Sequence, residues 1–424
     1  MNRILRGTLT CGLIVITSMA LFTGGLALGH FTARPADTAP QLDLLLNLEA
    51  SGPTAAEDKL MAPFWEAWDL VHQEYVDQPV DDTKLAQGAI RGMMAALGDP
   101  HSSYMNPTEY EIEVSNQSGD LQGIGAYVEA AGDYLRIVSP FPGSPAEAAG
   151  LRPGDLIIKV DGVDVAGLGE FEIISRVRGP EGTTVHLTIQ REGEKEPLEF
   201  TLVRARIHIP SVESKMLDGN VAYVKVNDFG DKTTAELKDA LKSLEVNQPV
   251  GLVLDLRGNP GGYLNTAIEV VSQFISDGVV MREKYGDGRE RTYEAIPDGL
   301  ATQIPLVVLI DKGSASASEI VAGAIQDTRR GTIVGEKSYG KGSVQNWREL
   351  RGDNGAVRVT IARWLTPSGR SIHQVGITPD VAVEMTEDDH AAERDPQLDK
   401  AVSILTSSAG AVHPFARAAL LEMR

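Results

Sequence analysis

The chain has 424 residues and a formal charge of −20, from 59 acidic and 39 basic side chains. This length allows two or three domains with cores of their own, and the acidic balance argues against nucleic acid as a partner. The single cysteine, Cys11, excludes a disulfide, a cysteine metal site and a thiol nucleophile from the rest of the chain. Because no His-Glu-x-x-His motif is present either, we expect no metal and no cofactor.

The N-terminus has the pattern of a membrane-targeting segment. Arg3 and Arg6 precede an uncharged stretch over residues 7–29, which is long enough to cross a bilayer. We expect residues 1–29 to act as a transmembrane signal-anchor in the inner membrane, with the rest of the chain on the periplasmic, extracytoplasmic side. The small residues of the stretch also fit a cleaved signal peptide, and the protein would then be secreted.

The composition changes along the exported part of the chain. Residues 30–58 are rich in Ala, Pro, Thr and Asp and are expected to form a spacer. Apolar residues at helical spacing predict a helical N-terminal region over 59–118. Short strands separated by Gly and Pro follow over 119–206.

Strands and helices alternate over residues 207–385. Strands are predicted at 221–226, 251–256 and 306–310, and helices at 233–244, 264–274 and 318–326. This rhythm predicts an α/β core with a largely parallel, buried sheet, whose active site lies at the carboxyl ends of the strands. Residues 386–424 are expected to form a partly helical tail, so the whole chain is a multidomain α/β (α+β) protein.

Two segments near the carboxyl ends of predicted strands carry the candidate chemistry. Ser314, Ser316 and Ser318 alternate with alanines where an apolar strand turns into a helix, and Lys341 follows in a glycine-rich loop. A serine at such a turn is exposed, and a buried lysine can serve as its base. The pattern predicts a serine–lysine hydrolase, but the residues alone do not choose among the three serines.

Other interpretations of these segments fail. Residues 335–341 nearly spell a phosphate-binding loop, but Gly342 stands where Ser or Thr must bind Mg²⁺, and the following residues are typical of a strand. None of the eight histidines stands in the setting of a Ser-His-Asp triad. Lys337 is a weaker candidate base than Lys341, because the adjoining Glu336 favours its charged form.

The sequence resembles the carboxyl-terminal processing peptidases, which are the tail-specific serine proteases of peptidase family S41. The resemblance lies in Ser-Ala-Ser-Ala-Ser-Glu at 314–319 and Gly-Lys-Gly-Ser-Val-Gln at 340–345, supported by motifs at 97–104, 255–262, 366–372 and 376–380. It covers nearly everything after the spacer. It implies an inserted PDZ domain at 119–206 and a crotonase/Clp-protease-like βα core at 207–385.

The resemblance also implies roles for individual residues. Ser316 is the expected nucleophile, because Lys341 follows it by 25 positions, which is the family's spacing between nucleophile and lysine. Lys341 is the expected general base, and Gln345 is expected to orient it. A neutral amide suits that role, because a carboxylate would raise the pKa of the lysine. Ser318 is expected to cap the helix, and Ser314 to support the loop.

Two binding features complete the expected site. The oxyanion would accept hydrogen bonds from the Ala317 N–H and from Gly262 or Gly261, with Gly262 favoured by the resemblance. The PDZ domain would hold a free C-terminus by the backbone N–H groups of one loop. That loop consists of Gly123, Ile124, Gly125 and Ala126.

We therefore expect a serine endopeptidase that recognises and cleaves C-terminal tails of exported proteins, assisted by its PDZ domain, which could activate or inhibit. Relatives suggest a homo-oligomer formed through the helices at 59–97 and 395–405, and an adaptor protein is a further candidate partner. A PDZ scaffold with a silent protease core is one alternative. A crotonase-like acyl-handling enzyme is another, although it would lack a PDZ insert and a nucleophilic serine.

Overall fold

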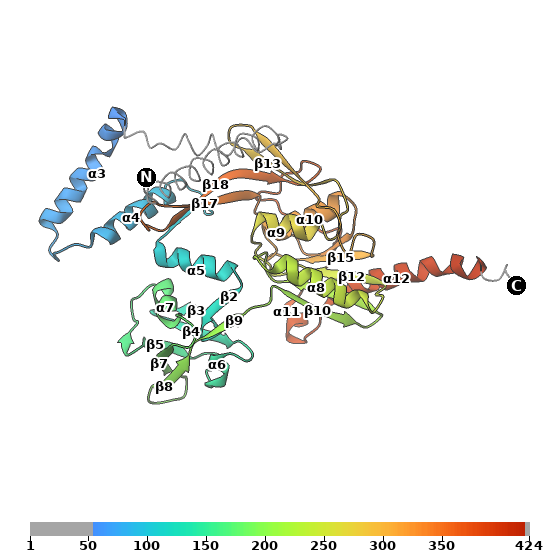
Figure 1. The fold of residues 1–424 in the computed structure, drawn as a ribbon, viewed down its shortest axis with the longest axis horizontal. Coiled ribbons are helices and arrows are strands. Elements are labelled where there is room, and N and C mark those ends of the chain that lie inside the picture. The colour runs from blue at the N-terminus through green and yellow to red at the C-terminus, as the bar shows by residue number, and fades with distance from the viewer. Residues whose placement is uncertain (1–53, 420–424) are drawn as a thin grey trace, which may run out of the picture. The chain divides into compact units, whose positions relative to one another are not determined.

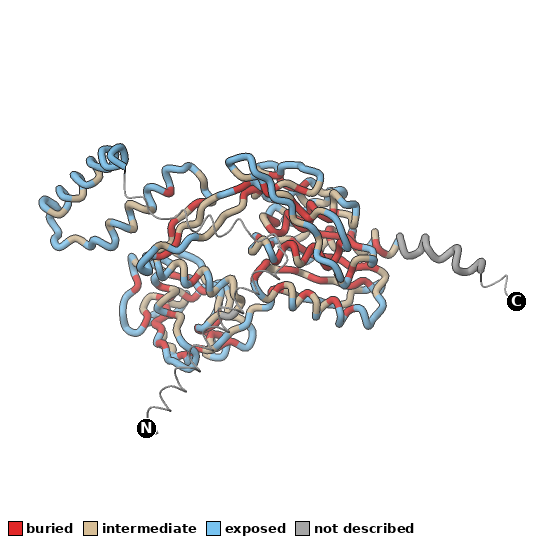
Figure 2. The backbone as a smooth tube through the Cα atoms, turned by 45° about the horizontal axis from the view of Figure 1, so that its top comes forward, coloured by how far each residue is buried: buried red, intermediate tan, exposed pale blue. Residues whose placement is uncertain are grey.

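The computed structural model describes residues 54–419 and divides into two compact units, one ending at Asp82 and one beginning at Thr83. The first unit contains helix α3 (Ala55–Glu74), which is capped at Thr54. The Thr54 hydroxyl accepts a hydrogen bond from the Glu57 N–H, and the Glu57 carboxylate accepts one from the Thr54 N–H. No side chain of α3 is buried, and the helix is pale blue and tan in Figure 2.

The predicted membrane segment at 7–29 and most of the predicted spacer lie outside the described residues. In the part of the chain from residue 54 to 419, no helix is both long enough and apolar enough to cross a membrane.

The second unit begins with two helices and a strand. Helix α4 (Asp82–Ala95) is followed by strand β1 (Ser103–Met105) and helix α5 (Pro107–Gln117). Strand β1 pairs antiparallel with a strand near the end of the core, β18 (Ala356–Leu365), with Ser103 opposite Arg358. The region that apolar spacing predicted as helical thus also contributes a strand to a distant sheet.

Residues 120–208 form an antiparallel sheet and a separate two-stranded sheet. In the two-stranded sheet, β2 (Asp120–Gly123) pairs antiparallel with β9 (Ala205–His208). The first and last strands of this region therefore lie side by side. The sheet has the order β3-β4-β5-β7-β8, with β6 beside β5 and β3 at one edge. Its elements are β3 (Ala126–Ala131), β4 (Tyr134–Pro140), α6 (Pro145–Ala148), β5 (Leu156–Val160), β6 (Val163–Asp164), α7 (Glu170–Val177), β7 (Thr184–Gln190) and β8 (Leu198–Val203).

The central sheet of the core has the order β10-β11-β12-β15-β16-β19, and every pair except β10–β11 is parallel. Its strands are β10 (Val212–Leu217), β11 (Val221–Val226), β12 (Gly251–Asp255), β15 (Leu306–Ile310), β16 (Thr332–Gly335) and β19 (Val381–Ala382). The expected mixed α/β architecture is confirmed. All residues of β12 and β15 are buried, as the continuous apolar runs predicted.

Helices cover both faces of this sheet (Figure 1). Alternate strand residues such as Leu252 and Leu254 pack with helices α8 (Thr233–Glu245), α9 (Leu264–Val271) and α10 (Ala317–Asp327). Residues between them, such as Val253, pack with α12 (Pro396–Ala419), whose Ala401 and Leu405 are buried. The described beginning of α12 therefore packs within the chain, although we expected this helix to serve self-association.

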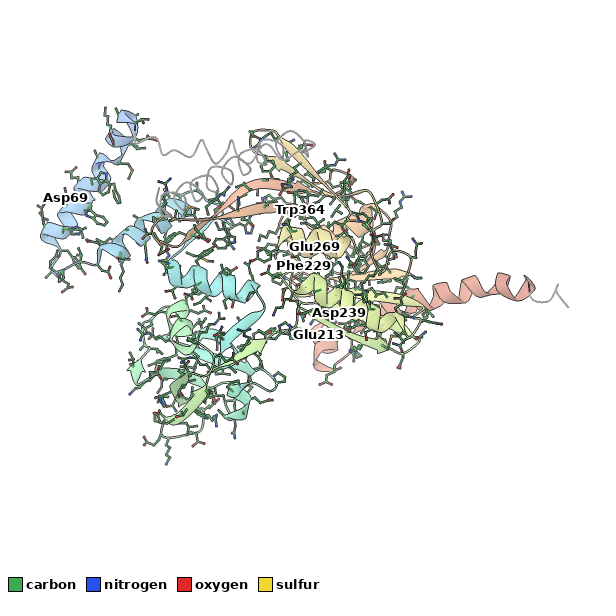
Figure 3. The ribbon with its side chains drawn as sticks, viewed as in Figure 1. Asp69, Glu213, Phe229, Asp239, Glu269 and Trp364 are labelled. Atoms are coloured by element: carbon green, nitrogen blue, oxygen red, sulfur yellow. The ribbon has the colours of Figure 1, made fainter. Side chains whose placement is uncertain are left out.

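A second sheet completes the core. It has the order β1-β18-β13-β14, and β17 also pairs with β18. Its further strands are β13 (Val279–Tyr285), β14 (Glu290–Glu294) and β17 (Ser343–Glu349), and a short helix α11 (Glu387–Ala391) precedes α12. Trp364 of β18 and Phe229 are among the largest fully buried side chains of the core (Figure 3).

Candidate active site

Ser316 lies between strand β15 and helix α10 and is the N-cap of that helix. Its φ of 55° and ψ of −113° fall where residues other than glycine are rare. A strained serine at a strand-to-helix turn is typical of a nucleophile, because the turn holds the hydroxyl out from the backbone. Ser316 is half-buried and lines a pocket of 450 Å³.

The two neighbouring serines have structural partners instead. The Ser314 hydroxyl is buried and donates to the Leu256 carbonyl oxygen at 2.8 Å. The Ser318 hydroxyl is also buried and donates to the Asn259 carbonyl oxygen at 2.9 Å. Both therefore hold the loop after β12 against α10. The expectation that Ser318 caps the helix is wrong, because α10 begins one residue earlier, at Ala317.

Glu319 joins the turn at Ser316 to the loop that carries Lys341, and the sequence interpretation missed it. Its fully buried carboxylate accepts hydrogen bonds from the Ser316 N–H at 2.8 Å and the Lys341 N–H at 2.9 Å. It also accepts from the Gly340 N–H at 2.7 Å and the Ser338 hydroxyl at 2.6 Å. A glutamate three residues after a helix-capping serine is a known capping pattern, and that signal could have identified it.

Lys341 lies between β16 and β17 and lines the same pocket as Ser316. Burial lowers the pKa of its ammonium group, and the positive charge of Arg358 lowers it further. The carboxylates of Glu319, Asp99 and Glu113 act in the opposite direction. All of these charged groups come from segments distant from Lys341 in the sequence.

Gln345 lies on β17, and its side chain also lines the pocket. Its amide nitrogen Nε2 is 2.9 Å from the Ser343 hydroxyl and 3.1 Å from the Thr360 hydroxyl. The carbonyl oxygen Oε1 has no hydrogen-bond donor among the described residues.

The glycine loop after β12 approaches Ser316 closely. A Cβ atom on Gly261 would lie 2.8 Å from the Ser316 Cβ and 2.9 Å from the Ala317 nitrogen. The Gly261 N–H donates to the Asn259 side-chain oxygen at 2.8 Å. By contrast, the N–H groups of Gly262 and Ala317 have no acceptor within residues 54–419. The geometry therefore favours Gly262 with Ala317, rather than Gly261, as an oxyanion hole.

Asn259 fixes this loop and was also missed. Its side chain is fully buried, and its Nδ2 donates to the Val226 carbonyl oxygen at 2.7 Å. Since its Oδ1 accepts from Gly261, the amide shapes the turn from both ends.

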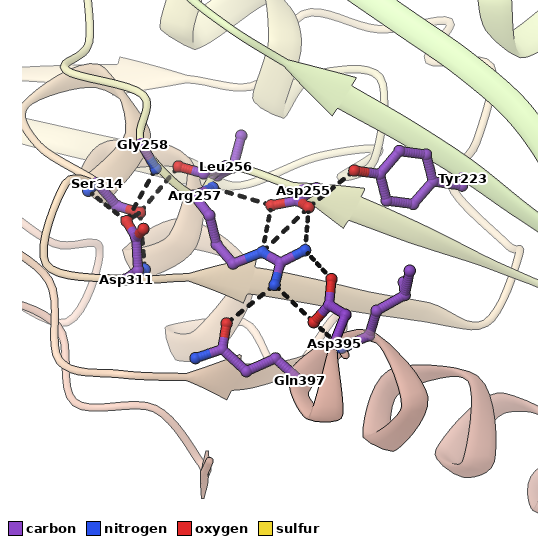
Figure 4. Close-up of polar contacts among 10 residues, drawn as sticks. Tyr223, Asp255, Leu256, Arg257, Gly258, Asp311, Ser314, Asp395 and Gln397 are labelled. Atoms are coloured by element: carbon purple, nitrogen blue, oxygen red, sulfur yellow. Dashed lines mark hydrogen bonds and ion pairs between the residues drawn. The ribbon is translucent and has the colours of Figure 1, made fainter. Parts of the chain in front are cut away.

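Behind the loop, Arg257 connects the core sheet to the start of α12 (Figure 4). Its guanidinium donates to Asp255 at 2.6 Å and to Asp395 at 2.8 Å, and it also donates to Gln397 at 3.0 Å. Tyr223 donates its hydroxyl to Asp255 at 2.9 Å. This network ties the residues at the end of β12 to the start of α12.

The PDZ-like region carries a second pocket, of 80 Å³, lined by the predicted loop Gly123, Ile124, Gly125 and Ala126. Gly125 has φ of 76°, and a Cβ there would lie 2.5 Å from the Ser144 Cβ, so only glycine fits. In the described chain, the N–H groups of Ile124 and Gly125 have no acceptor. The edge strand β3 follows directly, as expected for pairing with a peptide.

Arg178, which the sequence interpretation missed, lines this pocket beside the loop. Its Nη2 donates to the Asn116 side chain of α5 at 2.7 Å, and burial lowers the pKa of its guanidinium. Its Nη1 is buried and has no hydrogen-bond partner within the described residues. The pocket therefore combines free backbone donors with an unused cationic donor.

No metal centre accompanies these sites. Across residues 54–419, no group of three or more His, Cys, Asp and Glu side chains is arranged to hold a metal ion.

Comparisons with known proteins agree with this geometry. The family model described as "Peptidase family S41" matches residues 220–383, a PDZ domain model matches 136–191, and the model "Activating protease CtpB N-terminal domain" matches 36–108. The fold and these matches define a serine-type peptidase with a PDZ domain.

Individual relatives identify the family. The carboxy-terminal-processing protease of Bartonella bacilliformis is 41% identical over 334 residues, which are 77% of this chain and 75% of the relative. The carboxy-terminal processing protease CtpB of Bacillus subtilis is 38% identical over 336 residues, which are 78% and 69% of the two chains. A solved photosystem II D1 C-terminal processing protease is 30% identical, with a TM-score of 0.49, over 78% of this chain and 94% of that chain. The chain belongs to peptidase family S41, among the carboxy-terminal processing proteases, and the resemblance in its sequence is confirmed.

Proposed function

We propose that the protein is a Ser–Lys endopeptidase that cleaves the C-terminal tails of exported proteins, with Ser316 as nucleophile and Lys341 as general base. The observation that carries the proposal is that Ser316, Lys341 and the two unused N–H groups of Gly262 and Ala317 line one pocket.

In the proposed reaction, the neutral Lys341 amine takes the proton from the Ser316 hydroxyl as its Oγ attacks the scissile carbonyl carbon. The oxyanion accepts hydrogen bonds from Gly262 and Ala317. Lys341 returns the proton to the leaving nitrogen, the C–N bond breaks, and an acyl ester on Ser316 remains. A water molecule then gives its proton to Lys341 and hydrolyses the ester, after which the proton returns to the serine oxygen.

This reaction requires a lysine that is neutral in part of the enzyme population. An ordinary lysine, with a pKa near 10.4, is almost fully charged at neutral pH. Burial of Lys341 and the nearby Arg358 both lower its pKa, which supports its role as a base.

Tail recognition is assigned to the PDZ pocket. A substrate C-terminus would pair with the edge strand β3, and its carboxylate would accept hydrogen bonds from Ile124 and Gly125. The free Nη1 of Arg178 offers a charge-assisted bond to the same group. This arrangement supports a preference for proteins with an accessible C-terminal carboxylate.

The experiment that tests the catalytic assignment compares Ser316→Ala and Lys341→Ala with the wild-type protein. Both variants should lose cleavage of a substrate with an unstructured tail, while their circular dichroism and Tm stay unchanged. Lys337→Ala is the matched control, because Lys337 is an exposed lysine of the same loop and should not matter. Undiminished proteolysis by either active-site variant would show that another group performs the chemistry. A wild-type protein that binds the tail but does not cleave it would instead indicate a PDZ scaffold with a silent protease core.

We further propose that residues 7–29 anchor the protein in the inner membrane with the protease outside the cytoplasm. The motivation is the basic N-terminus before a long uncharged stretch. Carbonate extraction of membranes should leave the full chain in the pellet and release a version that lacks residues 1–29. Release of the full chain, with a new N-terminus found by sequencing, would indicate a cleaved signal peptide.

A further inference from the structure

Asp99 belongs to the motif at 97–104, and no residue of this motif takes part in the proposed reaction. Its Oδ2 accepts a hydrogen bond from the Thr360 hydroxyl at 2.5 Å and another from the Ser102 hydroxyl at 2.6 Å. Its Oδ1 accepts from the His101 N–H at 3.1 Å. Partial burial favours the neutral acid, but these three hydrogen bonds prevail and lower the pKa of Asp99 to about 2. The carboxylate is therefore ionised at neutral pH and can only accept hydrogen bonds.

The charge of Asp99 determines which way Thr360 can bond. A threonine hydroxyl has one proton, and Thr360 gives it to Asp99. Toward any other neighbour, the Thr360 oxygen can only accept. That neighbour is the Gln345 side chain, at 3.1 Å. Only the NH₂ end of the amide can face Thr360, because the carbonyl end would bring two acceptors together.

The remaining contact of the amide agrees with this orientation. The same Nε2 also donates to the Ser343 hydroxyl at 2.9 Å, so both of its N–H bonds have acceptors. The carbonyl oxygen Oε1 is the end without a protein donor in residues 54–419, and Gln345 and Lys341 line the same pocket.

We propose that Asp99, acting through Thr360, fixes the orientation of the Gln345 amide so that its carbonyl oxygen faces Lys341. The inference rests on the proposed function of Lys341 and Gln345. A carbonyl oxygen accepts an N–H of the neutral lysine and leaves the nitrogen lone pair free for the Ser316 proton. A reversed amide presents its N–H groups, which repel the ammonium form and compete for the lone pair. Asp99 and Thr360 are thus positioning residues.

A purely structural role is the competing explanation. Ser102, which also donates to Asp99, accepts the Thr360 N–H at 3.0 Å, so the cluster also ties the segment before β1 to β18. The test must therefore distinguish orientation of the amide from attachment of the strand.

The experiment uses Thr360→Val in the full-length protein, since valine has the shape of threonine without its hydroxyl. We expect kcat on a tail substrate to fall about tenfold, as for the loss of one well-placed hydrogen bond, with KM unchanged. Thr360→Ser should restore kcat, because it keeps the hydroxyl. Ser102→Ala removes a different donor to Asp99 and should leave kcat close to that of the wild-type protein.

The pH dependence gives a second readout that a loosened strand would not change. Reversal of the amide removes an acceptor from the lysine ammonium, which lowers the pKa of Lys341. The acidic limb of the kcat/KM profile of Thr360→Val should therefore move to lower pH. Asp99→Asn should act in the same direction for two reasons: an asparagine can donate to Thr360 and free the threonine proton for Gln345, and the change also removes a negative charge that favours the Lys341 ammonium. Thr360→Val, which leaves that charge in place, is therefore the variant that tests the orientation.

The decisive measurement is a double-mutant cycle with Gln345→Ala. We expect Thr360→Val to slow the wild-type enzyme but not the Gln345→Ala enzyme. An equal slowing in both backgrounds would overturn the proposal that Asp99 and Thr360 act through the Gln345 amide. So would full activity of Gln345→Ala or Thr360→Val. If Ser316→Ala is inactive in these cases, the orientation proposal fails while the Ser–Lys assignment stands. If Ser316→Ala is active, the proposed function and the orientation proposal both fail.

Discussion

At the scale of single residues, the charges around Lys341 influence the pH range in which it could serve as the proposed base. Arg358 is the nearby cation that disfavours the ammonium form, whereas Glu319, Asp99 and Glu113 favour it. These four groups come from four separate parts of the chain, so the charge balance is a property of the folded site. The balance can be tested by removing one charge at a time.

Replacement of Arg358 by Gln should move the acidic limb of the kcat/KM profile to higher pH. Loss of the positive charge makes the lysine ammonium less unfavourable, so the pKa of Lys341 rises and less of the base is neutral at a given pH. The measurement is kcat/KM against pH. Arg363→Gln is the control, because this exposed arginine of the same strand is not among the groups that influence Lys341. A limb that stays in place would mean that Arg358 does not tune the base.

The choice among the three serines shows what sequence reasoning could reach at this scale. Ser314, Ser316 and Ser318 have nearly identical neighbours in the sequence, and the resemblance pointed to Ser316. The physical distinction is the positive φ of Ser316 and the buried partners of the other two, which depend on the loop after β12. The contact between Asp99 and Thr360 joins residues 261 positions apart, and no local pattern could predict it.

At the scale of elements, the loop from Gly258 to Gly262 sets the space beside Ser316. Gly261→Ala should lower kcat by roughly 10²–10³, the effect of losing an oxyanion donor, because the added Cβ overlaps the Ser316 turn and forces the loop outward. Gly258→Ala is the matched control: its φ of 69° is also positive, but its Cβ would meet no atom within 4 Å. Single-turnover kinetics would check this, and equal losses in both variants would indicate backbone strain instead.

A second element, helix α12, depends on Asp395. This carboxylate accepts from Arg257 and from the Leu398 N–H at the start of the helix. Asp395→Ala should lower the free energy of unfolding by about 1.5–3 kcal/mol, measured by urea denaturation. Asp399→Ala is the control, since Asp399 lies exposed in the first turn of the same helix.

The effect of Asp395 should depend on pH in a defined direction. Burial raises its pKa, but hydrogen bonds from Arg257 and Leu398 prevail and leave the pKa below its usual value. Its stabilisation is therefore present above an unfolded pKa of about 3.9 and is lost as the pH falls through the lower folded value. The difference between wild-type and Asp395→Ala proteins should vanish in strong acid. A constant difference would mean that the charge of Asp395 is not involved.

The elements that sequence patterns predicted best are those whose burial is complete. The strands β12 and β15 are buried at every residue, and β11 is buried at four of its six residues; all three appear within one residue of the predicted bounds. The eight-residue α7 and the hairpin of β13 and β14 were not predicted. Helix α7 has apolar residues at helical spacing, with Ile173 and Val177 buried, but its eight residues are too few for a reliable prediction. Strand β14 reads Glu-Arg-Thr-Tyr-Glu and has no buried residue, so it has no apolar alternation. Yet α7 and the residue after it supply one wall of the PDZ pocket.

At the scale of the whole molecule, the paired strands β2 and β9 make the PDZ region removable in principle. Since Gly123 lies opposite Ala205, a short Gly-Ser turn could replace residues 124–204. We expect this variant to hydrolyse short peptides but to lose its preference for tails with a free carboxylate over amidated tails. The ratio of the two kcat/KM values measures that preference. A ratio equal to that of the full chain would assign tail recognition to another surface, and the change in basal rate tells whether the PDZ region activates or inhibits.

The pairing of β1 with β18 also bears on when the enzyme becomes active. Ser103 lies opposite Arg358, so β1 can pair only after a strand more than 250 residues later has been made. A ribosome delivers the N-terminal end first, at about 5–20 residues per second. For at least ten seconds of synthesis, the emerging chain already contains Asp99 but lacks Thr360, and Lys341 arrives only shortly before. The site around Lys341 and Gln345 can therefore be completed only after most of the chain has been synthesised.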